Sequence, residues 1–499
     1  MADPSLDQLR RSFRRAVERR TPWEQLWRDC YAYAMPLRGF GLGSEFAAAS
    51  RFAERLFDST AADAVEQLAA SLLAELTPPW SRWFGLRPGQ GVPPEHTGVI
   101  AEELDRVADI VQGHFDRSGF AVEMHQCFLD LATVGTATLM FREAPAGETS
   151  AFRFAAVPAA EIFVDGEGGT TRRVFRLSAM TAGAIRSAFP AAVLPAALED
   201  AGDRRVDVIE AVWPTGEGYG YRAFLAEADG SATEAPLAGG RFEQSPFITF
   251  RWLKGAGEVY GRSPVMTALP DIKTANKVVE LVLKNASIAA TGIWLADDDG
   301  VLNPANIKLT PGSIIPKAPG SAGLTPLQAP GRFDVSELVL SDLRSRIRHT
   351  LLIDRLGPVD GPRMTATEVA ERSAQTGRLL GAVYGRLQAE LLGPLLGRAM
   401  AILRRRGEIP DVLVDGRMAD LHWRSPLARA QARDDVSNTL LWLEKVSQLG
   451  PEAKAVIDPG AAARWLARML GVPGELVRED VGLADGLLQL LAGGAGHAG

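Results

Sequence analysis

Basic side chains recur at helical spacing in two parts of the chain. Lys273, Lys277 and Lys284 follow the spacing i, i+4 and i+11, which places them along one face of a helix. A second row with the same spacing consists of Arg344, Arg348 and Arg355. Such rows can contact phosphate groups, or they can pair with Asp and Glu side chains. Only eight lysines occur in the chain, and five of them fall within one stretch: Lys273, Lys277, Lys284, Lys308 and Lys317.

Short motifs of enzyme chemistry are missing from the sequence. There is no Gly-Lys pair, hence no Walker-type phosphate loop, and no His-Glu-x-x-His, Cys-x-x-Cys or Gly-x-Ser-x-Gly. Gly39 to Gly43 is glycine-rich, but no strand precedes it and its third glycine is misplaced for a dinucleotide loop. Asp297-Asp298-Asp299-Gly300 lacks the alternation and the distal glutamate of a calcium loop, which favours a polar turn. We therefore expect no catalytic residue, no metal site and no cofactor.

Composition indicates a folded, soluble chain of several domains. The 499 residues are 46% hydrophobic and 23% charged, with a net charge of −7 that argues against a nucleic-acid coat protein. The two cysteines, Cys30 and Cys127, lack metal-ligand spacing and favour reduced, intracellular folding. The N-terminus has no apolar signal core, and no window of 18 uninterrupted apolar residues predicts a membrane span.

The first half of the chain predicts helices followed by short strands. Helices are expected at 5–35, from about 60 to 76, near 97–117 and near 119–134. The basic run from Arg10 to Arg20 is either a solvated helix face or a contact to DNA or a partner. Trp80, Trp83 and Phe84 are expected to form an aromatic anchor. From about 136 to 253, apolar alternation between Gly and Pro breaks predicts strands. Together these elements predict an α+β domain.

The second half predicts a helical hairpin and then a long helix. Helices are expected from about Pro264 to Ala290 and from Val335 to Ile353, and the irregular segment 293–332 would form a small domain at the tip. Gly and Pro interrupt 357–362. Thr365 and Glu368 then match a capping box that begins a helix to about Arg406, with a kink at Gly393-Pro394. Three glycines at four-residue spacing would permit close helix approach: Gly377, Gly381 and Gly385. Shorter helices are expected from 426 onward, and 493–499 is expected to be disordered.

Five segments, in order, resemble one known family. They are Trp27 to Pro36, Asp58 to Ala61 leading to Leu76–Phe84, Tyr260 to Lys273, Met364 to Val369, and Glu390 to Leu395. Together they are similar to the head-to-tail connector family, the portal proteins of short-tailed, podovirus-type bacteriophages. The most distinctive segment is Tyr260-Gly-Arg-Ser-Pro-Val-Met-Thr-Ala-Leu-Pro-Asp-Ile-Lys273. The resemblance spans about 25 to 450.

This resemblance implies an α+β, mainly helical portal fold assembled as a ring of about twelve subunits. The implied parts, in chain order, are a wing at 1–262, a stem helix at 263–292, a clip at 293–332, a second stem helix at 333–354, a tunnel loop at 355–363, a long kinked helix at 364–406, and a return strand with a helical crown at 407–499.

The resemblance also implies a function without catalysis. The ring would occupy the unique capsid vertex, pass double-stranded DNA without sequence specificity during packaging and ejection, and dock the terminase motor and a tail adaptor. Further partners would be the major capsid and scaffolding proteins, with no membrane, and assembly would take place in the host cytoplasm. Two alternatives are another ring-forming virion adaptor, although adaptors are usually shorter, and a soluble enzyme with a dispersed site.

Three groups of residues receive roles from this resemblance. Repeated around a ring, the two basic rows, including Arg355, would form belts facing DNA unless they pair with acidic residues of neighbouring subunits. The clip residues Trp294, Lys308 and Lys317 would join neighbours and dock partners by strand addition. The tunnel loop would narrow the channel and yield to DNA, and it consists of Leu356, Gly357, Pro358, Val359, Asp360, Gly361, Pro362 and Arg363.

Overall fold

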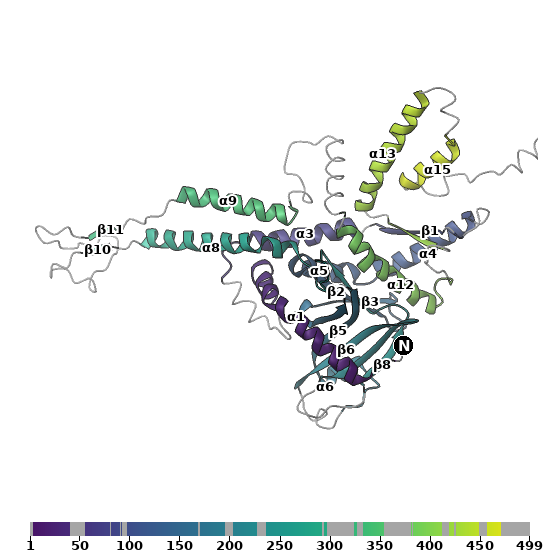
Figure 1. The fold of residues 1–499 in the computed structure, drawn as a ribbon, viewed down its shortest axis with the longest axis horizontal. Coiled ribbons are helices and arrows are strands. Elements are labelled where there is room, and N and C mark those ends of the chain that lie inside the picture. The colour runs from purple at the N-terminus through teal and green to yellow at the C-terminus, as the bar shows by residue number, and fades with distance from the viewer. Residues whose placement is uncertain are drawn as a thin grey trace, which may run out of the picture.

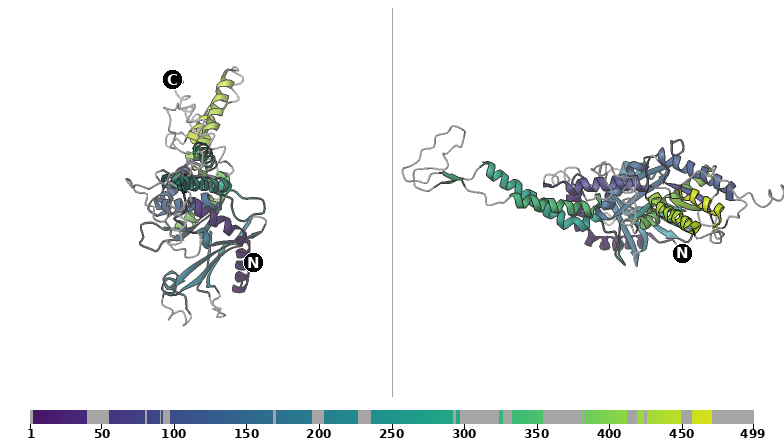
Figure 2. Two further views of the ribbon diagram at one scale, coloured as in Figure 1. Left: turned by 90° about the vertical axis from the view of Figure 1, so that its left-hand side faces the viewer. Right: turned by 90° about the horizontal axis from the view of Figure 1, so that it is seen from above.

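The computed structural model shows a body of sheets and helices from which a long arm projects (Figure 1). The structure describes residues 3–39, 55–79, 81–89, 91, 97–167, 170–194, 203–226, 236–291, 294–296, 324–326, 333–353, 381, 383–411, 419–423, 426–448 and 457–470. Viewed from above, the same arm extends well beyond the body (Figure 2). The molecule therefore has two unequal regions.

The first helix, α1 (Leu6–Ala34), agrees with the predicted range. A capping box begins it, because Gln8 N–H donates to the Ser5 hydroxyl and Ser5 N–H donates to the Gln8 side chain. The Arg20 guanidinium is buried on this helix, where it donates to the carbonyls of Ala160 and Ile162 and covers the Phe163 ring at 3.8 Å. Part of the basic run thus attaches the helix to the body.

Two antiparallel sheets form the strand-rich region, as the sequence predicts. One has five strands in the order β4-β5-β6-β7-β8, and the other has three in the order β3-β2-β9. Their bounds are β2 (Thr136–Glu143), β3 (Phe152–Val157), β4 (Ile162–Glu167), β5 (Thr170–Thr181), β6 (Arg205–Thr215), β7 (Gly218–Leu225), β8 (Ala238–Phe242) and β9 (Phe247–Arg251). A 3₁₀ turn, η2 (Ala159–Glu161), precedes β4, and α6 (Ala182–Ala188) follows β5. The prediction of an α+β domain is confirmed.

Helices pack beside these sheets around one large apolar core. They are α3 (Thr60–Leu76), α4 (Thr97–Asp116), α5 (Phe120–Val134) and α12 (Gly393–Arg405). The first three agree with the predicted ranges. Phe115, Phe120 and Phe154 form ring contacts in this core, and Trp83 and Phe84 join them. The aromatic anchor is thus buried at Trp83 and Phe84, while Trp80 lies outside the described residues.

Segments that are far apart in the sequence contact each other in the body. Strand β1 (Phe84–Pro88) pairs antiparallel with β12 (Ala419–Trp423), more than 300 residues later in the sequence. At Gly135, which has a φ of 74°, the backbone passes so close to Arg262 that a side chain would not fit. This glycine lets the segment before the arm lie directly on the end of α5.

In the part of the arm that the structure describes, two helices lead to a strand pair. They are α8 (Pro264–Thr291), α9 (Phe333–Thr350), β10 (Trp294–Ala296) and β11 (Leu324–Pro326). The Ser263 hydroxyl accepts from Met266 N–H and donates to the Thr133 carbonyl, so it caps α8 and fixes the helix to the body. The two helices of the predicted hairpin are therefore present, whereas most of the expected small domain at 293–332 lies outside the described residues.

The described residues after 380 are mostly helical, as predicted, and include an irregular turn, whereas the expected capping box at Thr365 and Glu368 lies outside the described residues. A π-helical turn, η4 (Gln388–Leu392), precedes Gly393-Pro394 at the expected kink, where proline cannot donate to the preceding turn. Then follow α13 (Pro426–Gln448) and α15 (Pro459–Leu470). A side chain at Gly381 or Gly385 would meet nothing within 4 Å in this single chain, so the expected close helix approach is not seen at these two positions.

Candidate functional site

The predicted channel residues lie on the arm, and the first of them is attached to the body. Lys273 projects from α8 toward α1, where its ammonium is 2.6 Å from the Asp29 carboxylate and 5.8 Å from the centre of the Tyr33 ring. Both side chains of this pair are partly exposed. Lys273 therefore has a positioning contact inside its own chain.

Lys277 and Lys284 lie on the same flank of α8, farther from the body. Both donate to Glu280, at 2.9 Å from Lys277 and 2.6 Å from Lys284. Hydrogen bonds from Lys284 and Lys277 lower the pKa of Glu280. This cluster carries two cations and one carboxylate, and its lysines are largely exposed. The cluster therefore has a net positive charge, although both lysines are paired with Glu280.

On α9 the two described arginines have different surroundings. Arg344 donates to Asp58, in the turn before α3, over 2.9 Å, whereas Arg348 is exposed. Burial alone would raise the pKa of Asp58, but hydrogen bonds from Thr60 and Arg344 outweigh it, so the pKa is lowered. Asn276 of α8 accepts from the backbone N–H of Asp58 at 3.1 Å. Asp58 is therefore a junction of the body with both arm helices.

A further ion pair joins the two arm helices to each other. Arg346 of α9 donates to Asp271 of α8 over 2.9 Å. The sequence interpretation did not single out these two residues. They hold the helices together just beyond the body.

The outer faces of the arm carry exposed leucines. Leu281 follows the buried Ile272 by nine residues, and Leu338 precedes the buried Ile347 by nine residues. Nine residues of an α-helix turn the side chain to the opposite face. Leu338 is 74% exposed and Leu281 is 49% exposed in the single chain. Each arm helix thus presents an exposed leucine on the face opposite its buried isoleucine.

At the tip, β10 and β11 pair antiparallel with Leu295 opposite Thr325. This strand pair contains the backbone of Trp294. The other proposed docking residues, Lys308 and Lys317, lie outside the described residues, and so do Arg355 and the tunnel loop residues 356–363.

The π-helical turn is held by a buried ion pair. Arg251 at the end of β9 makes two hydrogen bonds to Glu390, at 2.9 and 2.6 Å, and also donates to the Val259 carbonyl. Arg386 is a second cation beside Glu390, at 3.4 Å. Bidentate Arg–carboxylate geometry fixes direction as well as distance. The irregular turn is thereby fastened to the strand that leads toward the arm.

Within the described part of the chain, no group of three or more His, Cys, Asp and Glu side chains is arranged to hold a metal ion. Among the helices that the structure describes, none is long and apolar enough to cross a bilayer.

Comparison with protein families decides what kind of chain this is. The model of the family described as "Bacteriophage head to tail connecting protein" matches residues 6–477. The chain belongs to this family. The match includes the body, both helices of the arm and the helices that follow.

Individual members of the head to tail connecting family are distant from this chain. The portal protein of Enterobacteria phage T3 is 24% identical over 64% of this chain, and the match spans 59% of that protein, which is less than two thirds of its length. The portal protein of Escherichia phage T7 is 21% identical over 80% of this chain and 75% of its own length. The portal protein of Salmonella phage epsilon15 is 23% identical over 95% of this chain and 88% of its own.

The sequence of this family member was sufficient to identify the basic residues of the arm, but not the acidic residues with which they form ion pairs. The Lys277–Glu280–Lys284 cluster could have been found, because i, i+3 and i, i+4 pairs are neighbours on a helix. Asp29 and Asp58 lie 244 and 286 residues from Lys273 and Arg344, and no local spacing relates them. The basic rows were expected either to be bare or to pair between subunits, whereas the pairs observed here lie within one chain.

Proposed function

We propose that this protein is a portal subunit that forms a ring of about twelve copies at one capsid vertex. DNA would pass through the centre of the ring during packaging and ejection, in the virion and, during assembly, in the host cytoplasm. The family match over residues 6–477 carries this proposal. The arm supports it, because Leu281 on one side and Leu338 on the other leave apolar surface that a neighbouring copy would cover.

A closed ring follows naturally from the arrangement of these leucines. One lies on α8 and the other on α9, so we propose that the α8 side of one arm meets the α9 side of the next. Such a head-to-tail contact repeats around an axis and closes when the rotation per subunit divides a full turn. In the assembled ring the arms would form the stem (263–292 and 333–354).

The remaining parts have proposed roles in the same assembly. Residues 1–262 form the wing, 293–332 the clip, 364–406 the long kinked helix and 407–499 the return strand and crown. The clip, with Trp294, Lys308 and Lys317, docks the terminase motor and later a tail adaptor. The wing contacts capsid and scaffolding proteins. The loop 355–363 narrows the channel.

Electron microscopy of the purified chain tests the ring. We expect rings with a central hole from the wild type and loss of rings from Leu281→Glu and Leu338→Glu, because each places a charge in the proposed contact. Val122→Glu is the matched control, since Val122 is an exposed apolar residue of α5, outside the arm. A monomeric wild-type chain, or rings that persist in both arm variants, would contradict the proposal.

The proposed channel contacts are Lys277, Lys284 and Arg348. Lys277 and Lys284 lie four residues before and three residues after Leu281 on the same face of α8, so we propose them at the channel edge of the subunit contact. These side chains are exposed, whereas Lys273 and Arg344 are tied to Asp29 and Asp58. Charge reversal at Lys277 and Arg348 is expected to impair DNA packaging or ejection in rings that still assemble. Lys273→Glu instead is expected to weaken the attachment of α8 to α1. Unchanged packaging and ejection in assembled double-variant rings would remove the channel role.

Two deletions test the clip and the tunnel loop. Removing 297–325 is expected to give heads that lack DNA or tails. Replacing 357–362 by two glycines is expected to leave ring formation intact and to reduce the retention of packaged DNA. Full, tailed particles from the first deletion, or normal DNA retention in the second, would contradict the corresponding role.

A further inference from the structure

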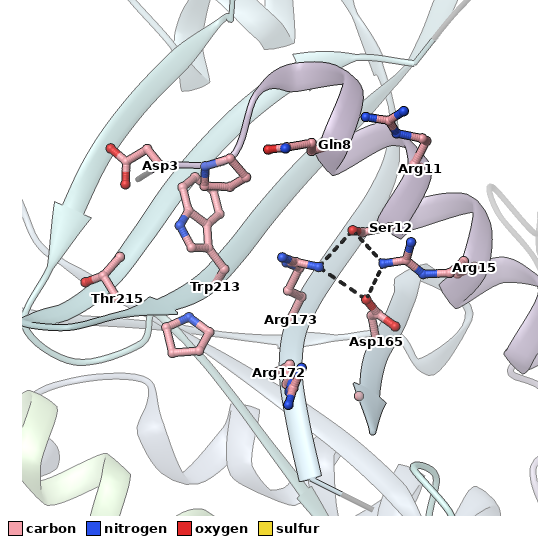
Figure 3. A pocket seen from close by; sticks show the side chains of 13 residues that line it. Asp3, Gln8, Arg11, Ser12, Arg15, Asp165, Arg172, Arg173, Trp213 and Thr215 are labelled. Atoms are coloured by element: carbon pink, nitrogen blue, oxygen red, sulfur yellow. Dashed lines mark hydrogen bonds and ion pairs between the residues drawn. The ribbon is translucent and has the colours of Figure 1, made fainter. Parts of the chain in front are cut away.

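A groove lies between the first helix and the five-stranded sheet, far from the arm. Its volume is about 710 Å³, and it is lined on one side by the start of α1 and on the other by β4, β5 and β6 (Figure 3). Gln8 and Arg15 mark two turns of α1 along the groove, about 10 Å. The groove is therefore elongated along the helix, and it involves the basic run that the proposed function leaves without a role.

One end of the groove concentrates positive charge. The buried Asp165 carboxylate faces three guanidinium groups, those of Arg19 at 2.9 Å, Arg15 at 3.4 Å and Arg173 at 3.5 Å. Arg15 and Arg173 also donate to the Ser12 hydroxyl, at 3.0 and 2.8 Å, so their positions are fixed from both sides. Figure 3 shows Arg15 and Arg173 converging on Ser12 and Asp165. Three cations on one carboxylate leave an excess of positive charge.

Two more arginines lie along the groove. Arg11 on α1 and Arg172 on β5 line the same groove, and both are exposed. Counting all groove-lining ionisable side chains, four arginines face two aspartates, Asp3 and Asp165. The chain as a whole carries a net charge of −7, so this local surplus is opposite in sign to the molecule. Like charges held together in a partly enclosed site repel one another, and an added carboxylate relieves that repulsion.

The other end of the groove is largely apolar, with the polar side chains of Asp3 and Thr215 beside it. Trp213, Pro214 and Pro4 line it, and Figure 3 shows Trp213 beside Asp3, away from the Ser12–Asp165 cluster. Asp3 itself is paired with Arg241 at 3.1 Å. A ligand that fills the groove must therefore carry negative charge at one end and an apolar group at the other.

We propose that this groove binds a short acidic segment of a partner protein. An extended stretch of about three residues has the length of the groove. Its carboxylates would meet the guanidinium forks of Arg11 and Arg172, which suit carboxylate geometry, and its apolar side chain would lie on Trp213. A DNA duplex presents its phosphates on a convex surface and cannot enter between a helix and a sheet. The proposal is independent of ring formation and of the channel.

Fluorescence anisotropy with the full-length chain tests the groove. The probe is a short rhodamine-labelled peptide in which glutamates precede leucines, and its control replaces glutamate by glutamine. The Arg11→Glu/Arg172→Glu variant is expected to bind the probe at least about tenfold more weakly, because two charge-assisted contacts become repulsive. Arg106→Glu, an exposed charge reversal on α4, is expected to bind like the wild type. Arg11→Lys/Arg172→Lys is expected to retain part of the affinity.

Three results would overturn the proposal. They are no binding of the glutamate probe to the wild type, equal binding of the glutamine probe, and unchanged binding by the Arg11→Glu/Arg172→Glu variant with an unaltered unfolding transition. Competition experiments show whether the groove prefers an acidic peptide over other anions. Displacement of the probe by inorganic phosphate or a DNA duplex, at concentrations where an unlabelled acidic peptide also displaces it, would make the groove a general anion site and exclude the peptide assignment.

Discussion

The body and the arm bury their apolar side chains in different ways. In the body, Phe141, Phe152 and Phe154 pack together with ring centres 4.4 to 6.1 Å apart, and all three are buried within one chain. In the arm, Leu343 and Ile347 are buried near the body, in the same large core, whereas Leu281 and Leu338 are exposed. Large apolar side chains are thus covered within the single chain in the body, whereas some of those on the arm remain exposed.

This difference indicates where each region obtains its stability. A sheet covered by helices can enclose a core, but two helices side by side have too little area to cover more than one face of each other. The arm depends on contacts at its base, such as Arg344 with Asp58, and, in our proposal, on neighbouring copies. Substitutions in the body should therefore change the folding of the single chain, and substitutions on the arm should change assembly.

The largest effect on the single chain is expected from Phe141→Ala. This ring is fully buried against Phe152 and Phe154, and the Arg398 guanidinium covers it at 5.6 Å. The resulting cavity should lower the free energy of unfolding by about 3–5 kcal/mol, measured by urea denaturation. The exposed Val122→Ala serves as control. A loss as small as that of the control would mean that the body core is not the main source of stability.

A smaller loss is expected from Glu390→Gln, at the junction of the π-helical turn with β9. The substitution keeps the shape of the side chain but leaves the buried Arg251 without its countercharge. We expect a loss of about 2–3 kcal/mol in the free energy of unfolding. Glu444→Gln on α13 is a control at an exposed glutamate-containing pair. Equal stability of the two variants would show that the Arg251–Glu390 pair contributes little.

Asp58→Asn tests the connection between body and arm, and its effect should depend on pH. The pKa of Asp58 is lowered in the folded chain, so its contribution to stability is fully present above the unfolded pKa of about 4 and is lost as the pH falls through the folded pKa. Near neutral pH the variant should be about 1–2 kcal/mol less stable than the wild type. Thermal unfolding at a series of pH values should show the two proteins converging below about pH 4. A constant difference across that range would contradict this role.

The smallest effect on the single chain is expected from Leu338→Ala. This side chain is largely exposed, so the free energy of unfolding of the isolated subunit should change by less than about 0.5 kcal/mol. Sedimentation of the same variant should nevertheless show weaker assembly than the wild type. A large loss of subunit stability with normal assembly would reverse the proposed difference between the two regions.

Local pattern was sufficient to predict most elements. Periodicity and capping residues placed α1, α3, α4, α5, α8 and α9 close to their observed bounds, and Gly393-Pro394 indicated the irregularity at η4. Alternation between Gly and Pro breaks identified the strand-rich region, although it did not predict the order of strands in the two sheets. These features depend on residues a few positions apart, which is the range over which side chains act on the backbone.

The partners of the charged residues were decided only by the tertiary structure. The sequence by itself determined that Lys273, Lys277 and Arg344 lie on helix faces, but the carboxylates Asp29 and Asp58 approach them across more than 200 residues. The groove near Ser12 likewise depends on the tertiary structure, because Arg15 and Asp165, which meet there, are separated by 150 residues in the sequence. Spacing along a chain fixes the direction of a side chain on its own helix or strand, whereas the group that it meets depends on how those elements pack.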